Sequence, residues 1–335
     1  MAFDSIEGVF NAFTKMKVLI IGDSMVDTYT YGEVHRVSPE APVPILQAQK
    51  TEHRLGGAAN VALNIQALGA HPILCTLAGA DTEADLLVRL LEQQRISAAQ
   101  VVKSDERVTT VKHRVLSGSQ HLLRIDKETE RSLTAAERSS LTAFIEPLMS
   151  EVDLILLQDY DKGCLSKELI QWIIRGAQEC SVPVVVDPKK KNFLTYQGVS
   201  LFKPNLSEMQ TGLGLETLSL DESSLADAAA LLSGKMQFDQ LLLTLSGDGV
   251  YYYSDAVSGK LPAHLRSIAD VSGAGDTVIS IAGLCCALNL PLLFTAELAN
   301  LGGGIVCEYP GVMPIDPIRL LGEAQSNELL LAQLK

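Results

Sequence analysis

The sequence has few basic residues for its length. Its 335 residues include 27 Lys and Arg against 40 Asp and Glu, which gives a formal net charge of −13. Nucleic acids and anionic membrane surfaces both reward a basic face, so neither is an expected partner. A local basic pocket for a small phosphate remains compatible with this charge.

The patterns of several common sites are also missing. The six cysteines form no C-x-x-C pair and the six histidines form no H-x-x-x-H group, so a disulfide framework or a zinc site is not expected. Reduced cysteines instead favour a cytoplasmic protein. No G-x-G-x-x-G, G-x-x-x-x-G-K-[ST] or G-x-S-x-G pattern occurs, which removes the main support for dinucleotide, Walker-type and serine-nucleophile sites.

Targeting and membrane segments are not expected either. The first 17 residues lack a basic start followed by an apolar core, and they predict a short amphipathic helix instead of a signal peptide. The apolar run 278–298 is interrupted by Asn289 and Pro291, which favours two consecutive buried helices over a membrane span.

Short apolar runs alternate with helix-like stretches along most of the chain. The expected strands are 17–23, 72–79, 152–160, 182–188 and 238–249, and the expected helices are 56–70, 81–94 and 166–179, with a last surface helix near the C-terminus. This alternation predicts an α/β fold with a mostly parallel sheet covered by helices on both faces. The segments 28–54 and 107–128 interrupt it with strand-like residues and predict a small β-flap.

Polar residues gather at the predicted carboxyl ends of the strands, where ligands bind in open parallel sheets. They are Asp23, Asp27, Asp159, Asp187, Asn205, Glu208, Ser246 and Gly247. A single acid after a strand is common in loops, but so many on one rim favour a binding site there.

Two glycine-rich stretches precede predicted helices. In "ADVSGAGDTV" (269–278), Gly273 and Gly275 leave backbone N–H groups open to an anion, while Asp276 is either a helix N-cap or a base beside that anion. In "RLGGAANVALN", Gly56 and Gly57 serve either tight packing or close approach of a substrate hydroxyl.

Two charged patterns also have two interpretations. Asn205 and Glu208 of "KPNLSE" form either a plain helix cap or part of a water-and-Mg²⁺ shell for phosphates. Lys112 and Arg114 have strand parity and point to one face. That face is either solvated or covers the site and grips an anionic substrate.

Three of these motifs together resemble the ribokinase-like (PfkB) carbohydrate kinases. "DVSGAGDT" resembles the family's D-T-x-G-A-G-D signature, "LGGAANVALNIQALGA" its di-glycine signature and "PNLSE" its N-x-x-E motif. "IGDSMVDTYTYGEVHRVSPEAPVPI", "VKHRVLSGSQHLLRID" and "QDYDKG" resemble the branch that phosphorylates D-glycero-β-D-manno-heptose 7-phosphate in lipopolysaccharide core synthesis. That branch acts alone or fused to a nucleotidyltransferase, for which this chain is too short, so the expectation is a stand-alone kinase domain over residues 1–335.

The resemblance assigns a role to each candidate residue. It implies a catalytic base at Asp276, an anion hole at Gly273, Ala274 and Gly275, and a Mg²⁺–ATP site at Asn205, Leu206, Ser207, Glu208, Thr244, Ser246 and Gly249, with Mg²⁺ held through water near Glu208. It implies sugar-phosphate contacts at Asp27, Gly56, Gly57, Asn60, Lys112, Arg114 and Asp159. Ser272, Gly118 and Glu308 depart from the family's or branch's usual residues.

The expected reaction is transfer of the ATP γ-phosphoryl group to the anomeric hydroxyl of heptose 7-phosphate. Another sugar or nucleoside kinase of the family is the alternative, and a non-catalytic sugar-binding regulator is a second one. Homodimerisation through the β-flap is the expected assembly.

Overall fold

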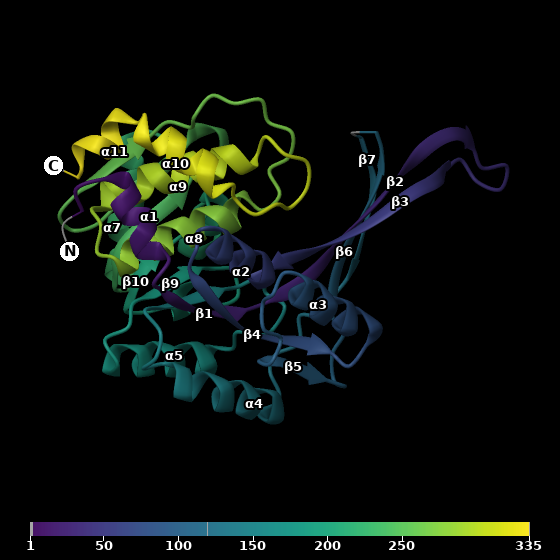
Figure 1. Cartoon of the computed structure of the whole chain (residues 1–335), viewed down its shortest axis with the longest axis horizontal. Helices are drawn as coiled ribbons and strands as arrows, with labels where there is room; N and C mark the ends of the chain where they lie inside the picture. Colours follow the sequence, from purple (N-terminus) through teal and green to yellow (C-terminus); the bar gives the residue numbers. More distant parts are fainter. Residues whose placement is uncertain (1–2, 119, 335) are drawn as a thin grey trace.

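The protein is described by a computed structural model that covers residues 3–118 and 120–334. Its main sheet has nine strands in the order β13-β12-β11-β10-β9-β8-β1-β4-β5 (Figure 1). The strands are β1 (Lys17–Gly22), β4 (His71–Gly79), β5 (Val101–Ser104), β8 (Leu154–Gln158), β9 (Val184–Asp187), β10 (Val199–Phe202), β11 (Phe238–Thr244), β12 (Val250–Tyr253) and β13 (Ser258–Leu261). The seven neighbouring strands β11-β10-β9-β8-β1-β4-β5 are parallel to one another. Strands β12 and β13 continue the sheet beyond β11 as antiparallel strands.

Helices cover both faces of this sheet, which confirms the predicted α/β class. They are α1 (Ile6–Phe13), α2 (Ala58–Ala67), α3 (Thr82–Gln93), α4 (Ala135–Ile145), α5 (Lys167–Glu179), α6 (Leu206–Leu213), α7 (Glu222–Lys235), α8 (Ala274–Ala287), α9 (Leu292–Val306), α10 (Pro317–Gln325) and α11 (Glu328–Ala332). Side chains of β1 alternate between two cores: Val18 and Ile20 lie in one, and Leu19 and Ile21 in the other. Continuous apolar runs in the sequence therefore mark strands that are buried on both faces.

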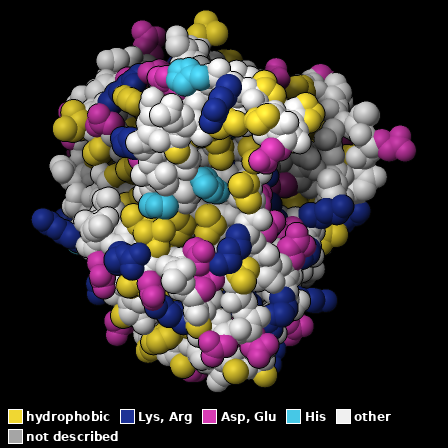
Figure 2. All heavy atoms as spheres, turned by 90° about the vertical axis from the view of Figure 1, so that its right-hand side faces the viewer, with side chains coloured by type: hydrophobic (Ala, Val, Ile, Leu, Met, Phe, Trp, Pro, Cys, Tyr) yellow, Lys and Arg dark blue, Asp and Glu magenta, His cyan; other side chains and the backbone are white. Residues whose placement is uncertain are grey.

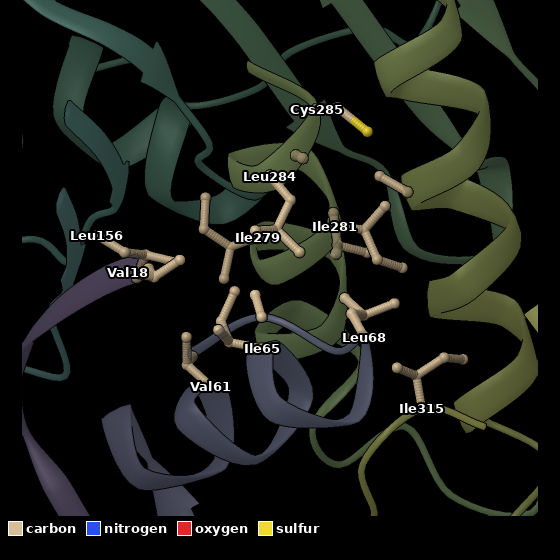
Figure 3. Packing of buried hydrophobic residues seen from close by; sticks show 14 of the residues in the cluster. Val18, Val61, Ile65, Leu68, Leu156, Ile279, Ile281, Leu284, Cys285 and Ile315 are labelled. Carbon is tan, nitrogen blue, oxygen red and sulfur yellow. The ribbon is translucent and has the colours of Figure 1, made fainter. Parts of the chain in front are cut away.

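The first core fixes the position of α8. Val61 and Ile65 of α2 lie against Ile279 of α8 and against the sheet residue Val18 (Figure 3). Helix α8 is apolar around nearly its whole circumference and is buried from Asp276 to Cys286. A helix held on all sides presents its first turn in one fixed place.

Successive strands are added first on one side of β1 and then on the other. From β1 it proceeds to β4 and β5 on one side, and later to β8, β9, β10 and β11 on the other. The carboxyl ends of β1 and β8 therefore flank a topological switch point, where ligands bind in open α/β sheets.

Four further strands form a separate sheet, which confirms the predicted β-flap. Its order is β3-β2-β6-β7, with β2 (Ser24–Val37), β3 (Pro44–Gly57), β6 (Thr110–Ser117) and β7 (Gln120–Lys127). The flap extends from the α/β body as a long twisted ribbon (Figure 1). It is longer than predicted, because β2 and β3 pair from Ser24 and Gly57 onward. Residue 119 of the predicted Ser-Gly-Ser turn lies outside the described residues.

Two further element predictions are also confirmed. Helix α1 forms near the N-terminus, and the apolar run 278–298 divides between α8 and α9 at Pro291, which caps the start of α9. Within residues 3–118 and 120–334, no helix is both long and apolar enough to cross a membrane.

Candidate active site

The start of α8 is built on a left-handed glycine. Gly273 is the N-cap residue with φ 84°, a conformation that favours glycine, and no described side chain caps the helix there. Ala274 and Gly275 open the first turn, whose backbone N–H groups lack intrahelical partners. The Ala274 N–H donates instead to the Val271 carbonyl at 3.3 Å. Asp276 follows as the third helical residue, so it is not the N-cap.

The Asp276 carboxylate is buried and receives three side-chain hydrogen bonds. Asn60 Nδ2 donates to Oδ2 at 2.8 Å, while Tyr160 Oη at 2.8 Å and Gln158 Nε2 at 3.2 Å donate to Oδ1. Burial raises the pKa of Asp276 to about 6, against the lowering effect of the Asn60 and Tyr160 hydrogen bonds. A carboxylate with this pKa is ionised at neutral pH and is a competent general base.

A buried ion pair lies beside the same helix start. Lys203 Nζ is 3.1 Å from Asp187 Oδ2, and both side chains are almost fully buried. A Cβ atom at Gly275 would lie 3.8 Å from each of these two atoms. The space in front of Gly275 is thus lined by the helix start, the Lys203 ammonium and the Asp187 carboxylate that pairs with it. The helix start and the ammonium suit a phosphoryl group.

Asn205 and Glu208 form a capping box at the start of α6. Asn205 Oδ1 accepts from the Glu208 N–H at 2.9 Å, and Glu208 Oε2 accepts from the Asn205 N–H at 2.8 Å. Leu206 and Ser207 supply the first turn of this helix. Asn205 and Glu208 therefore form the helix cap that was one of the two interpretations. The second oxygen of Glu208 forms an ion pair with Lys189.

Two carboxylates near Lys189, those of Asp187 and Glu208, are candidate ligands for a divalent cation. Within residues 3–118 and 120–334, no group of three or more His, Cys, Asp or Glu side chains could hold a metal ion by itself. Burial acts against the Lys189 charge, but Asp187 and Glu208 outweigh it and hold the pKa of Lys189 above its ordinary value. Asp187 Oδ1 is buried and has no hydrogen-bond partner among the described residues. One or two carboxylates suffice for Mg²⁺ that is also bound by nucleotide phosphates and water.

The predicted nucleotide-binding residues lie next to this cap. Thr244 ends β11 and forms a parallel bridge with Asn205. A short 3₁₀ helix (Ser246–Asp248) follows, in which Ser246 has φ 54°. Gly249 has φ 90°, and a Cβ there would collide with the Leu261 carbonyl. The structure thus gives Gly249 a packing reason, and its contact with a nucleotide stays a prediction.

The di-glycine of β3 is also required by packing. A Cβ atom at Gly56 would collide with the Asp27 carboxylate, and one at Gly57, where φ is 58°, would collide with the Asp23 carbonyl. These glycines bring β3 close enough to β2 for Asp27 to lie buried at the base of the flap. The structure therefore supports the packing interpretation of Gly56 and Gly57, and this packing positions Asp27, a candidate site residue.

Lys112 and Arg114 share the flap face that turns toward the site, as their parity predicts. In the parallel pairing of β2 with β6, Lys112 lies opposite Asp27 and Arg114 opposite Tyr29. Arg114 donates to Asp27, which keeps the pKa of Arg114 above its ordinary value despite burial. Lys112 Nζ lies 5.1 Å from the centre of the Tyr160 ring. Burial lowers the pKa of Lys112.

Asp159 has a structural role, and its contact with a sugar stays a prediction. Its carboxylate is buried and accepts from Tyr196 Oη at 2.6 Å, Asn192 Nδ2 at 3.1 Å and the Asp161 N–H at 2.8 Å. These partners lie in the loops after β8 and β9, and they use the carboxylate to hold those loops together. Asp23, by contrast, accepts three backbone N–H groups, from Tyr160, Lys162 and Cys164.

Sequence reasoning missed several residues of the site. They are Gln158, Tyr160, Lys189 and Lys203. Each lies within three residues of the end of a strand, in "LILLQDY", "VVVDPKK" or "LFKP". Their position at strand ends was the available signal, but the residues predicted at such ends included no lysine, tyrosine or glutamine.

Two departures from the family pattern have local explanations. Gly118 has φ 58° in the turn between β6 and β7, where a Cβ atom would meet no atom of the described residues beyond its chain neighbours within 4 Å. Glu308 accepts from Arg266 at 2.9 Å and from Arg319 at 2.7 Å, so it joins the loop before α8 to α10. Neither residue is among the described side chains that donate to the Asp276 carboxylate.

Residues 15–319 match the model of the pfkB family carbohydrate kinases. The chain belongs to this family. Relatives within it are the bifunctional protein HldE of Pseudomonas aeruginosa, 39% identical over 94% of this chain, and that of Chromohalobacter salexigens, 38% identical over 93%. The chain spans 65% and 64% of the lengths of these two relatives. The expectation of a stand-alone kinase therefore stays a prediction.

Solved structures of pfkB-type kinases share the fold. Phosphofructokinase-2 from Escherichia coli in complex with fructose-6-phosphate superposes with a TM-score of 0.76 at 18% identity, covering 93% of this chain and 99% of that one. Ribokinase of Arabidopsis thaliana complexed with ribose and ATP gives 0.68 at 15% identity, covering 91% and 98%. The ribokinase-like architecture expected from the motifs is thereby confirmed.

Proposed function

We propose that the chain transfers the γ-phosphoryl group of ATP to the anomeric hydroxyl of D-glycero-D-manno-heptose 7-phosphate. The buried Asp276 carboxylate beside an uncapped helix start is the observation that supports this most. The motif resemblance to the heptose-kinase branch supplies the sugar, and family membership supports the phosphoryl transfer.

In this reaction Asp276 accepts the proton of the anomeric hydroxyl as its oxygen bonds to the γ-phosphorus. The bond from that phosphorus to the bridging oxygen breaks, and ADP leaves. The N–H groups of Gly273 and Gly275 and the Lys203 ammonium stabilise negative charge on the moving group. Asn60 Oδ1 is buried without a partner among the described residues, which leaves an acceptor for a sugar hydroxyl.

Asp187 and Glu208 would hold Mg²⁺, directly or through water, beside the phosphates. The metal would neutralise phosphate charge during transfer. Asn205, Thr244 and Ser246 would line the nucleotide next to it, since they lie together at the ends of β10 and β11.

A substrate panel assayed for ADP release tests the proposal. Heptose 7-phosphate should be turned over with the highest kcat/KM, ahead of the unphosphorylated heptose, fructose 6-phosphate and ribose. Faster turnover of another sugar or of a nucleoside would assign the chain to a different specificity within the family. A calorimetric signal for sugar binding without ADP release from any sugar would favour a regulator.

Glu208→Gln should raise the Mg²⁺ concentration for half-maximal rate by about tenfold or more, the range seen when a residue next to a metal shell is changed. Glutamine still accepts from the Asn205 N–H, so the capping box survives, while the charge and the ion pair with Lys189 are lost. A Mg²⁺ titration at fixed ATP measures the shift. Glu137→Gln, in the capping box of α4, is the control. Identical titrations of the two variants would reduce Glu208 to a helix cap.

The flap also supports the expected homodimer. Leu123 and Ile125 alternate on β7 and are 55% and 51% exposed. Figure 2 looks at this side of the molecule and shows hydrophobic side chains gathered near histidines. Monomeric proteins seldom expose a contiguous apolar patch without a partner, so we propose that a second copy covers it.

Leu123→Asp combined with Ile125→Asp should therefore raise the dimer dissociation constant by about tenfold or more, because the interface would bury unpaired charges. Sedimentation velocity over a concentration series measures this. Leu231→Asp, a 45% exposed position on α7, is the matched control and should leave the constant unchanged. A native chain that stays monomeric throughout the series would refute the dimer.

A further inference from the structure

Tyr160 links the flap, the base and the phosphate side of the site. It is the second residue after β8, and its hydroxyl donates to Asp276 Oδ1 at 2.8 Å. Its own N–H donates to Asp23 at 2.8 Å. Lys112 Nζ of the flap and Lys189 Nζ of the β9 loop lie 5.1 Å and 5.3 Å from the centre of its ring.

A count of lone pairs distinguishes the two oxygens of the base. A carboxylate oxygen has two lone-pair sites. Oδ1 of Asp276 accepts from Tyr160 and Gln158, so both of its sites are filled. Among the described residues, Asn60 is the one donor to Oδ2, so one site remains. The remaining site is the place for a sugar hydroxyl.

We infer that Tyr160 is a positioning residue that fills Oδ1 of Asp276, together with Gln158, and so directs the sugar hydroxyl to Oδ2. This role rests on the proposed function, in which Asp276 takes the proton of that hydroxyl. Two hydrogen bonds to Oδ1 restrict rotation of the carboxylate. The free lone pair of Oδ2 therefore stays directed at the sugar hydroxyl.

The surroundings of Tyr160 hold its ring in place for this task. Asp23 receives three backbone N–H groups of the segment that contains Tyr160, so the backbone there is anchored to the end of β1. Cations within 6 Å of an aromatic ring attract it, and Lys112 and Lys189 supply two of them. Movement of the ring away from Asp276 would lose both contacts.

Tyr160→Phe tests the role because it removes the hydroxyl and keeps the ring. A hydrogen bond to the ionised carboxylate lowers its pKa, so the variant should raise the pKa of Asp276 by about one unit. Carbon-13 NMR of labelled aspartate carboxyls measures this without turnover, with Asp276→Asn identifying the resonance. In ADP-release assays kcat should fall about tenfold, the effect of one charge-assisted hydrogen bond, while KM for ATP stays within twofold.

Tyr196→Phe is the matched control. Tyr196 is also buried and donates to a carboxylate, that of Asp159, at 2.6 Å. Its loss should lower the melting temperature but leave the Asp276 titration and the acid limb of the pH–rate profile unchanged. An equal shift in both variants would mean a general structural effect and would overturn the inference.

Replacement of Tyr160 by 3-fluorotyrosine covers the case in which the phenylalanine variant fails to fold. Fluorine makes the phenol a stronger donor, so the pKa of Asp276 should fall. An unmoved pKa in either folded variant would overturn the role of Tyr160, whatever the activity. Absence of ADP release from the native chain on the whole substrate panel would refute the proposed reaction and this role with it, while the titration would still report whether the hydrogen bond exists.

Discussion

Asp276→Asn should lower kcat by about 10²–10⁴-fold while ATP and sugar still bind, because the loss of a general base has this typical cost. Asparagine matches the size of aspartate and still accepts hydrogen bonds, so α8 and its anion-binding start should persist. Steady-state kinetics measure kcat, and calorimetry measures the binding of ATP and of the sugar. Near-normal kcat would remove Asp276 from the reaction.

Asp221→Asn is the control for a purely structural helix-start acid. Asp221 is the N-cap of α7, where it accepts from the Ser224 N–H at 2.9 Å. Loss of such a cap costs about 1 kcal/mol of stability and should not change kcat. If the two variants behaved alike, Asp276 would be no more than a residue that stabilises its helix.

The pH dependence gives an independent check on the same carboxylate. Its pKa is raised to about 6 in the folded protein, so kcat/KM should fall tenfold per pH unit well below pH 6. The same shift affects stability: the folded state binds this proton more tightly than the unfolded state, so the native chain should gain stability relative to Asp276→Asn as pH falls through 6. Parallel denaturation curves of both proteins between pH 8 and pH 5 test the sign.

The helix start at Gly273 was predictable because its chemistry is local. Glycines at a helix N-terminus, with an acid one turn on, describe an anion site without any knowledge of the rest of the fold. The contacts of Asp276 were not predictable in this way. Asn60 and Tyr160 are separated from it by 216 and 116 residues, and only the packing of α2 and β8 around α8 brings them within reach.

Asp27 and Asp159 show the limit of the strand-end pattern. Both are buried acids, and the sequence gives both the signal of an acid that follows an apolar strand. In the structure Asp159 directly follows β8, whereas Asp27 lies near the start of β2. Arg114 of the flap reaches Asp27, whereas Tyr196 and Asn192 reach Asp159 from the loop after β9. The difference depends on which neighbouring loop lies over each carboxylate, and this is a tertiary property.

The substrate's own phosphate provides the second large expected effect. Lys112 forms no ion pair among the described residues and lies at the mouth of the flap beside Tyr160. Arg114 lies on the same face, partly engaged with Asp27. Charge-assisted contacts to a phosphate in a partly water-excluded site are worth about 1.5–3 kcal/mol each. Lys112→Ala combined with Arg114→Ala should therefore raise KM for heptose 7-phosphate by about 10²–10⁴-fold, with a far smaller change in KM for ATP.

The single variants separate two contributions that the double variant mixes. Arg114→Ala also leaves the buried Asp27 unpaired, so it should lower the melting temperature, whereas Lys112→Ala should weaken sugar-phosphate binding alone. Lys127→Ala is the matched control, since Lys127 lies one residue out of phase on β7 and pairs with Asp81 and Glu83 on the opposite flap face. The unphosphorylated heptose should be a poor substrate of the native protein, and the double variant should barely change its KM. Equal efficiency of the native protein with both sugars would refute the heptose-phosphate assignment and leave a kinase of unphosphorylated sugars, because these two cations would then have no phosphate to bind.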